Sequence, residues 1–158
     1  MKLSRKKVNV GGLTLGGDKI YIQSMLNVPA EDIENSVKQA IALEKAGCDI
    51  IRAAVPRVED AELISALKKA VSVPIVADIH FNYRIALACV GAGVDKIRIN
   101  PGNIGSSANV RAVADACRVH GIPIRIGVNS GSLERELLEK YGSPTPEALT
   151  ESALRHVE

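Results

Sequence analysis

The chain has 158 residues, of which 46% are apolar and 24% charged, and its 20 basic and 18 acidic side chains leave a net charge of +2. This apolar content excludes a disordered chain, and the near-neutral charge argues against a polybasic protein that binds nucleic acid or a membrane surface. No run of about 18 apolar residues predicts a membrane span, and no apolar segment follows the basic start as a signal peptide would require, so we expect a cytoplasmic globular protein.

Short β-branched runs alternate with longer helical patterns along the chain, which is typical of βα units around a parallel sheet. A hairpin is predicted first, with strands at 8–10 and 13–15 around Gly11-Gly12. Five strands are predicted after it, at 19–24, 49–55, 74–78, 95–100 and 123–129. Helices are predicted at 30–46, 59–71, 82–92 and 107–120, the first, third and fourth of which end at a glycine, and a last helix begins at Thr145-Pro146 and runs to Glu158.

One segment repeats: residues 46–52 (AGCDIIR) return as residues 92–98 (AGVDKIR). A repeated junction favours a barrel over an open doubly wound sheet, and no G-x-G-x-x-G follows the first predicted strand of the sheet. A full barrel needs at least about 200 residues, so this chain supplies about five of the eight βα units. We therefore predict an α/β fold, a partial (β/α)8 TIM barrel, with residues 1–158 as the N-terminal part of a longer protein; a complete flavodoxin-like sheet is the alternative.

Polar side chains gather where the predicted strands end. Because side chains alternate along a strand, Arg98 and Asn100 share one face while Ile97 and Ile99 share the other. The same alternation separates the polar from the apolar residues of the last strand. The predicted inward-facing polar residues are Gln23, Arg52, Asp78, His80, Arg98, Asn100, Arg125 and Asn129.

Three of these residues are arginines and only one is an aspartate. Buried cations without partners are costly, and the planar guanidinium matches two phosphate oxygens at once, so we predict a phosphate or diphosphate ligand. Gln23, Asn100 and Asn129 would donate neutral hydrogen bonds to it. Asp78 and His80 would act as an acid/base pair or orient a substrate hydroxyl. The alternative is that the arginines pair with carboxylates elsewhere in the protein.

Cysteines do not indicate a metal site. Cys48, Cys89 and Cys117 are widely spaced and odd in number, which fits a reducing compartment better than a disulfide framework. We expect them to be small core residues. Lys96 has the same parity as Arg98 but lies deeper in its strand, so it is a weaker candidate for the site.

Several segments together resemble the 4-hydroxy-3-methylbut-2-en-1-yl diphosphate synthase family. They are QSM at 23–25, VADIHF at 76–81, RINPGNIG at 98–105, PIRIGVN at 123–129, GSLE at 131–134 and KYG at 140–142. The resemblance covers almost the whole chain beyond Lys7. It implies the substrate-binding part of a TIM barrel that holds 2-C-methyl-D-erythritol 2,4-cyclodiphosphate, with Arg52, Arg98 and Arg125 gripping the diphosphate and Asp78, His80, Asn100 and Asn129 lining the same pocket.

The resemblance also implies partners and a cofactor. In the family a C-terminal domain carries a 4Fe-4S cluster, electrons arrive from ferredoxin or flavodoxin, and the enzyme is a homodimer. None of the three cysteines matches a cluster ligand, so the C-terminal iron-sulfur domain is expected to be absent from this chain, which alone would be inactive. The alternatives are another phosphate-binding barrel of the pterin-binding synthase type and a non-catalytic half barrel that self-associates.

Overall fold

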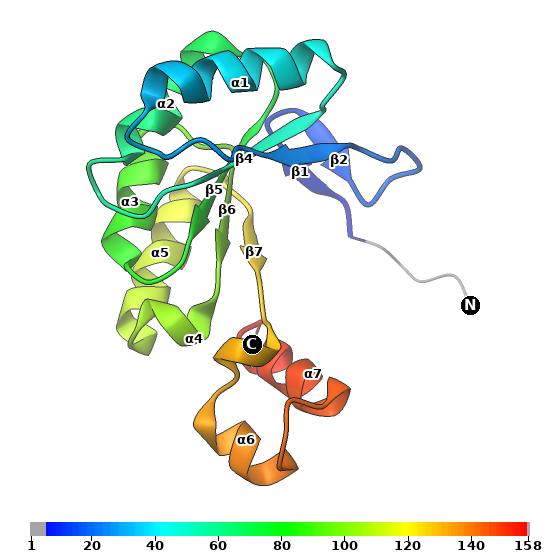
Figure 1. Ribbon diagram of the computed structural model, residues 1–158. Coiled ribbons are helices and arrows are strands. Elements are labelled where there is room, and N and C mark those ends of the chain that lie inside the picture. The colour runs from blue at the N-terminus through cyan, green and yellow to red at the C-terminus, as the bar shows by residue number, and fades with distance from the viewer. Residues whose placement is uncertain (1–5, 158) are drawn as a thin grey trace.

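The computed structural model describes residues 6–157, which form two sheets and a set of helices (Figure 1). An antiparallel pair, β1 (Val8–Val10) and β2 (Leu13–Leu15), stands apart from a five-stranded sheet whose order is β3-β4-β5-β6-β7. The five strands are β3 (Gln23–Met25), β4 (Ile50–Ala54), β5 (Ile75–Ile79), β6 (Lys96–Ile99) and β7 (Ile124–Ile126), and all four pairings are parallel. Parallel strands in chain order, joined by helices, confirm the prediction of a partial barrel.

The crossover helices all lie on one side of this sheet (Figure 1). They are α1 (Ile33–Lys45), α2 (Ala61–Ala70), α3 (Tyr83–Gly91) and α5 (Ser107–Val119). Two begin at a side-chain cap, because Asp32 accepts a hydrogen bond from the Asn35 amide and Asn82 accepts one from the Arg84 amide. The predicted glycines do follow α1, α3 and α5, each with a positive φ that other residues rarely adopt.

Three short helices complete the chain. They are α4 (Pro101–Ile104), α6 (Arg135–Tyr141) and α7 (Pro146–Arg155), and a 3-10 turn at Ser130–Ser132 precedes α6. Neither α4 nor α6 was predicted from the sequence. The predicted start of α7 is confirmed: Thr145 Oγ1 accepts a hydrogen bond from the Ala148 amide. The helix ends at Arg155, earlier than predicted, and residue 158 lies outside the described residues. Within residues 6–157 no helix is both long and apolar enough to span a bilayer.

The first strand of the sheet is shorter than predicted. Residues 19–22 are not in a strand because they have no partner in the neighbouring strand. The first residue of β4, Ile50, is paired with Gln23. Ile22 instead donates its amide to the Asp49 carboxylate at 2.8 Å. The last strand is also shorter than predicted, although Gly127 still donates its amide to the Ile99 carbonyl at 2.8 Å.

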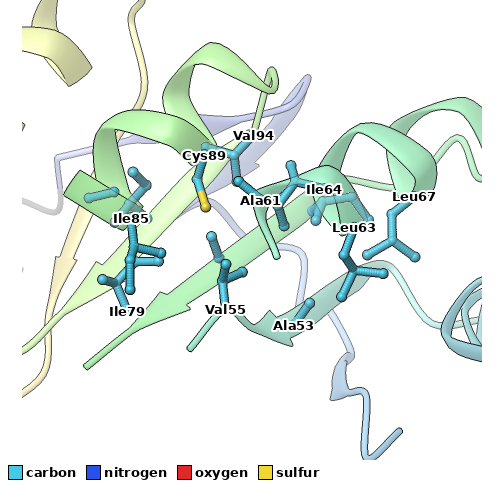
Figure 2. Close-up of a cluster of buried hydrophobic side chains, with 14 of the residues drawn as sticks. Ala53, Val55, Ala61, Leu63, Ile64, Leu67, Ile79, Ile85, Cys89 and Val94 are labelled. Atoms are coloured by element: carbon cyan, nitrogen blue, oxygen red, sulfur yellow. The ribbon is translucent and has the colours of Figure 1, made fainter. Parts of the chain in front are cut away.

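The main core lies between the five-stranded sheet and helices α1, α2, α3 and α5, and Figure 2 shows the part of it next to α2 and α3. Alternate strand residues face the helices, and those in β4 to β6 are buried: Ile51, Ala53, Ile75, Ala77, Ile79, Ile97 and Ile99. Leu63, Ile64 and Leu67 of α2 pack against them. Cys48, Cys89 and Cys117 are free and buried in this core, as predicted, and burial raises the pKa of the Cys89 thiol to about 12 and that of Cys117 to about 11.

The repeated Gly-x-Asp segment has a structural role at the amino ends of the strands. Asp49 accepts the Ile22 amide and Asp95 accepts the Ile75 amide, both at 2.8 Å, so each aspartate caps the strand before its own. The hairpin reaches this end of the sheet through Gly11. A Cβ there would lie 2.8 Å from Pro74 Cγ and 2.9 Å from Asp95 Oδ1, so only glycine fits without displacement.

Candidate functional site

Strand register brings most of the predicted polar residues onto the sheet face opposite the helices, which we call the inner face. Asp78 is paired with Arg98, and Arg98 in turn with Arg125. Arg52 lies on the same face, two residues before the partner of Asp78 in β4. Because the carboxyl ends of parallel strands meet at one edge of a sheet, these charges share one region.

Asp78 lies at the centre of this group. Its side chain is only 1% exposed, and its two oxygens accept from two arginines: Oδ1 from Arg98 Nη1 at 3.1 Å, and Oδ2 from Arg52 Nη2 at close range. His80 Nε2 lies 3.8 Å from Oδ2, and its side chain is 46% exposed. One carboxylate therefore holds two guanidiniums side by side, which leaves one of their positive charges uncompensated.

Arg52 also carries an unsatisfied donor. Its Nε is buried and has no hydrogen-bond partner among the described residues. A buried donor without an acceptor costs about 1–3 kcal/mol, so an acceptor supplied by a ligand would remove that cost.

Two further cations increase the positive charge of this face. Lys96 is buried, at 7% exposure, whereas Arg125 on the edge strand β7 is exposed. Burial lowers the pKa of the Lys96 ammonium, and repulsion from Arg125 and Arg52 lowers it further. Among residues 6–157, the inner face of the sheet therefore has four cations, Arg52, Lys96, Arg98 and Arg125, around the single carboxylate of Asp78.

The two predicted asparagines are joined through a serine. Asn100 is buried and donates its Nδ2 to Ser132 Oγ, which in turn donates to Asn129 Oδ1 at 3.0 Å. In the sequence, Ser132 falls within the motif at 131–134, and no role was predicted for it. A side chain that links two strand ends has no local pattern, and only its proximity to Asn100, 32 positions earlier, reveals it.

Gln23 is a predicted site residue that does not contact the group formed by Asp78, Arg52 and Arg98. It is exposed on the edge strand β3, and no hydrogen bond between it and the Asp78 group is found within residues 6–157. Its register partner, Ile50, lies two residues before Arg52. Gln23 thus has the inward parity predicted for it without a contact to the arginines.

The described residues do not fit an iron-sulfur cluster. Between residues 6 and 157 there is no group of three or more His, Cys, Asp or Glu side chains that could hold a metal ion. The three thiols are buried in the core, and those of Cys89 and Cys117 have raised pKa values, whereas cluster ligands are thiolates.

Comparison with known families shows the family of the chain. The family model described as the GcpE TIM-barrel domain matches residues 5–158. The chain belongs to the GcpE TIM-barrel family. The family resemblance found in the sequence motifs is thereby confirmed.

Two curated relatives of this GcpE chain have the same name. The 4-hydroxy-3-methylbut-2-en-1-yl diphosphate synthase (flavodoxin) of Pasteurella multocida is 58% identical over 153 residues, and that of Chromohalobacter salexigens is 56% identical over 154 residues. The matches cover 96% and 97% of this chain but 42% of each relative. The GcpE chain thus spans less than half of the length of these enzymes.

Solved structures support the fold of this GcpE domain. Dihydropteroate synthase from Xanthomonas albilineans superposes with a TM-score of 0.66 at 17% identity, over 97% of this chain and 60% of that one. The carboxyl transferase domain of Rhizobium etli pyruvate carboxylase gives 0.50 at 24% identity, over 65% and 21%. At such low identity these likenesses concern the fold alone, so the dihydropteroate synthase match does not support the pterin-binding alternative over the GcpE family.

Proposed function

We propose that this chain is the substrate-binding part of a 4-hydroxy-3-methylbut-2-en-1-yl diphosphate synthase. The whole enzyme would reductively open 2-C-methyl-D-erythritol 2,4-cyclodiphosphate to 4-hydroxy-3-methylbut-2-enyl diphosphate in the non-mevalonate isoprenoid pathway. The observation that carries the proposal is the inner face of the sheet, where Asp78 holds Arg52 and Arg98 together. This face has an excess of positive charge and a buried Arg52 Nε for which the described part of the chain provides no hydrogen-bond acceptor.

The residues divide into three roles. Arg52, Arg98 and Arg125 bind the diphosphate, because guanidinium forks pair with phosphate oxygens. The linked Asn100 and Asn129, together with Gln23, donate to substrate hydroxyls or to the remaining oxygens. Asp78 positions the two arginines, since both its oxygens are already engaged, and the half-exposed His80 is the side chain that can exchange a proton with substrate.

The remaining functions belong to other parts of the proposed enzyme. A 4Fe-4S cluster, held by residues outside this chain, would pass electrons from a donor protein to the substrate. The relatives' name supports flavodoxin as the electron donor, and ferredoxin is the alternative donor. A cytoplasmic homodimer is part of the same proposal.

The test uses a complete synthase, meaning residues 1–158 continued by the part of the Pasteurella multocida relative that lies beyond the match. The cluster-loaded protein is supplied with reduced flavodoxin and the cyclic diphosphate, and product is quantified. We expect turnover. We also expect Arg98→Met to lower kcat/KM by roughly 10–100-fold, which is the loss expected when charge-assisted hydrogen bonds to the substrate are removed.

Arg118→Met is the matched control, because Arg118 lies on α5 with its side chain 80% exposed, and its activity should equal that of the unmodified protein. Lack of turnover, in an assay where the unmodified Pasteurella multocida enzyme is active, would refute the proposed function.

A further inference from the structure

We propose that Gly127 is a positioning residue for Arg98, and that its missing side chain provides the space in which the Arg98 guanidinium lies. The inference deepens the proposed function, on which it rests, because it concerns how the diphosphate-binding arginine is held. Gly127 directly follows β7. It lies two residues after Arg125 and therefore on the same inner face.

The backbone of Gly127 does not itself require glycine. Its φ lies outside the positive range, unlike those of Gly105 and Gly142, and its amide continues the strand pairing by donating to the Ile99 carbonyl at 2.8 Å. Any residue could adopt this conformation. The requirement for glycine must therefore come from a neighbouring group.

That neighbour is the Arg98 guanidinium. A Cβ at position 127 would lie 2.6 Å from Arg98 Nη2 and 2.8 Å from Arg98 Cζ, and it would also overlap Nε. These distances are shorter than any van der Waals contact between such atoms. Because the side chain of Arg98 is flexible and the backbone of β7 is not, the guanidinium is the group that would move.

The displacement matters because the Arg98 guanidinium lies between Asp78 and Gly127. Its Nη1 donates to Asp78 Oδ1 at 3.1 Å on β5, and its Nη2 and Cζ lie against Gly127 on the β7 side. A methyl group at 127 would push the guanidinium away from this position. The fold would survive, since no backbone atom is among the three atoms met by the added Cβ.

The experiment compares Gly127→Ala, Arg98→Lys and the double variant in the complete cluster-loaded synthase. We expect Gly127→Ala to raise KM for the cyclic diphosphate roughly 10-fold or more through loss of a charge-assisted contact. The midpoint of thermal unfolding should fall by no more than about 4 °C, because only the Arg98–Asp78 pair is weakened. Because lysine has a smaller head group and no fork, the glycine substitution should add no further loss in the Arg98→Lys background.

Gly91→Ala is the control, since Gly91 has an ordinary φ and a Cβ there would meet no atom within 4 Å. Equal KM values for Gly127→Ala and the unmodified synthase, a large fall in the thermal midpoint, or additive losses in the double variant would each overturn the inference. Lack of activity in the unmodified synthase is a separate outcome, which refutes the proposed function instead.

Discussion

At the scale of single residues, the site depends on one carboxylate. Asp78 is almost fully buried and bonded to two arginines whose side chains are 22% and 13% exposed. Two guanidiniums that face the same ligand repel each other, and the carboxylate between them offsets that repulsion while leaving net positive charge for an anion.

Replacing Asp78 with asparagine should therefore destabilise the chain. Asp78→Asn leaves two partly buried guanidiniums without their counter-charge, and we expect the free energy of unfolding to fall by about 2 kcal/mol, allowing for solvent screening of the arginines. Urea denaturation measures it. Asp115→Asn is the control, because Asp115 forms an exposed pair with Arg118 and should change stability by less than about 0.5 kcal/mol. Equal effects of the two substitutions would show that Asp78 does not hold the arginines.

Ser132 permits a second test at this scale. Ser132→Ala removes the hydroxyl between the two asparagines and leaves the buried Asn100 amide without its acceptor. We expect a loss of about 1–3 kcal/mol in the free energy of unfolding, from an unsatisfied buried donor. Ser143→Ala, at an exposed loop position, is the control, and a Ser132 variant as stable as this control would contradict the network.

At the scale of secondary-structure elements, local patterns predicted the hairpin and the crossover helices. The limits of β1 and β2 were predicted to the residue, because two short alternating runs flank a Gly-Gly turn. The helix α6 was missed because it has only seven residues, and its single buried side chain, Leu137, packs against residues of α7. Its stability depends on that neighbour, which no local pattern encodes.

The α6–α7 pair should loosen in acid. Hydrogen bonds from Lys140, Tyr141 and Arg155 lower the pKa of Glu151 to about 2, from an ordinary value of 4.5. Since the pKa is lower in the folded state, the stabilisation is complete above pH 4.5 and is lost as the pH falls toward 2.

The measurement is hydrogen exchange of the α7 amides in the unmodified chain and in Glu151→Gln. We expect α7 to exchange faster in the variant at pH 6, and the difference between the two proteins to diminish at pH 3. A difference that is the same at both pH values would show that the Glu151 carboxylate does not hold the two helices together.

At the scale of the whole molecule, the described residues form an open sheet. Strands β3 and β7 lie at its two edges, and apolar side chains near the β3 edge are exposed: Ile20 at 89%, Ile22 at 63% and Met25 at 42%. Open edges with apolar side chains promote pairing with other chains.

We therefore expect residues 1–158, when produced alone, to self-associate at micromolar concentration. Sedimentation velocity should show dimers or larger species whose fraction increases with concentration. Ile20→Lys should reduce the association, because a charge beside the edge opposes pairing. Val119→Lys is the control, since Val119 is 78% exposed on helix α5 rather than next to the β3 edge, and should leave the association unchanged. A dilute monomer that persists on concentration would contradict this prediction.

The sequence by itself determined the order of the strands and crossover helices, the fold class and the face on which each strand residue lies, because side-chain alternation and helix caps are local properties. It also determined the excess of arginine on the inner face of the sheet. Only the tertiary structure decided that Asp78 joins Arg52 to Arg98, that Ser132 joins two asparagines and that Gly127 accommodates a guanidinium. Apart from the Ser132–Asn129 hydrogen bond, which is local, these contacts connect residues 20 to 32 positions apart on different strands or on the turn after the last one, and strand register, rather than local pattern, sets their distances.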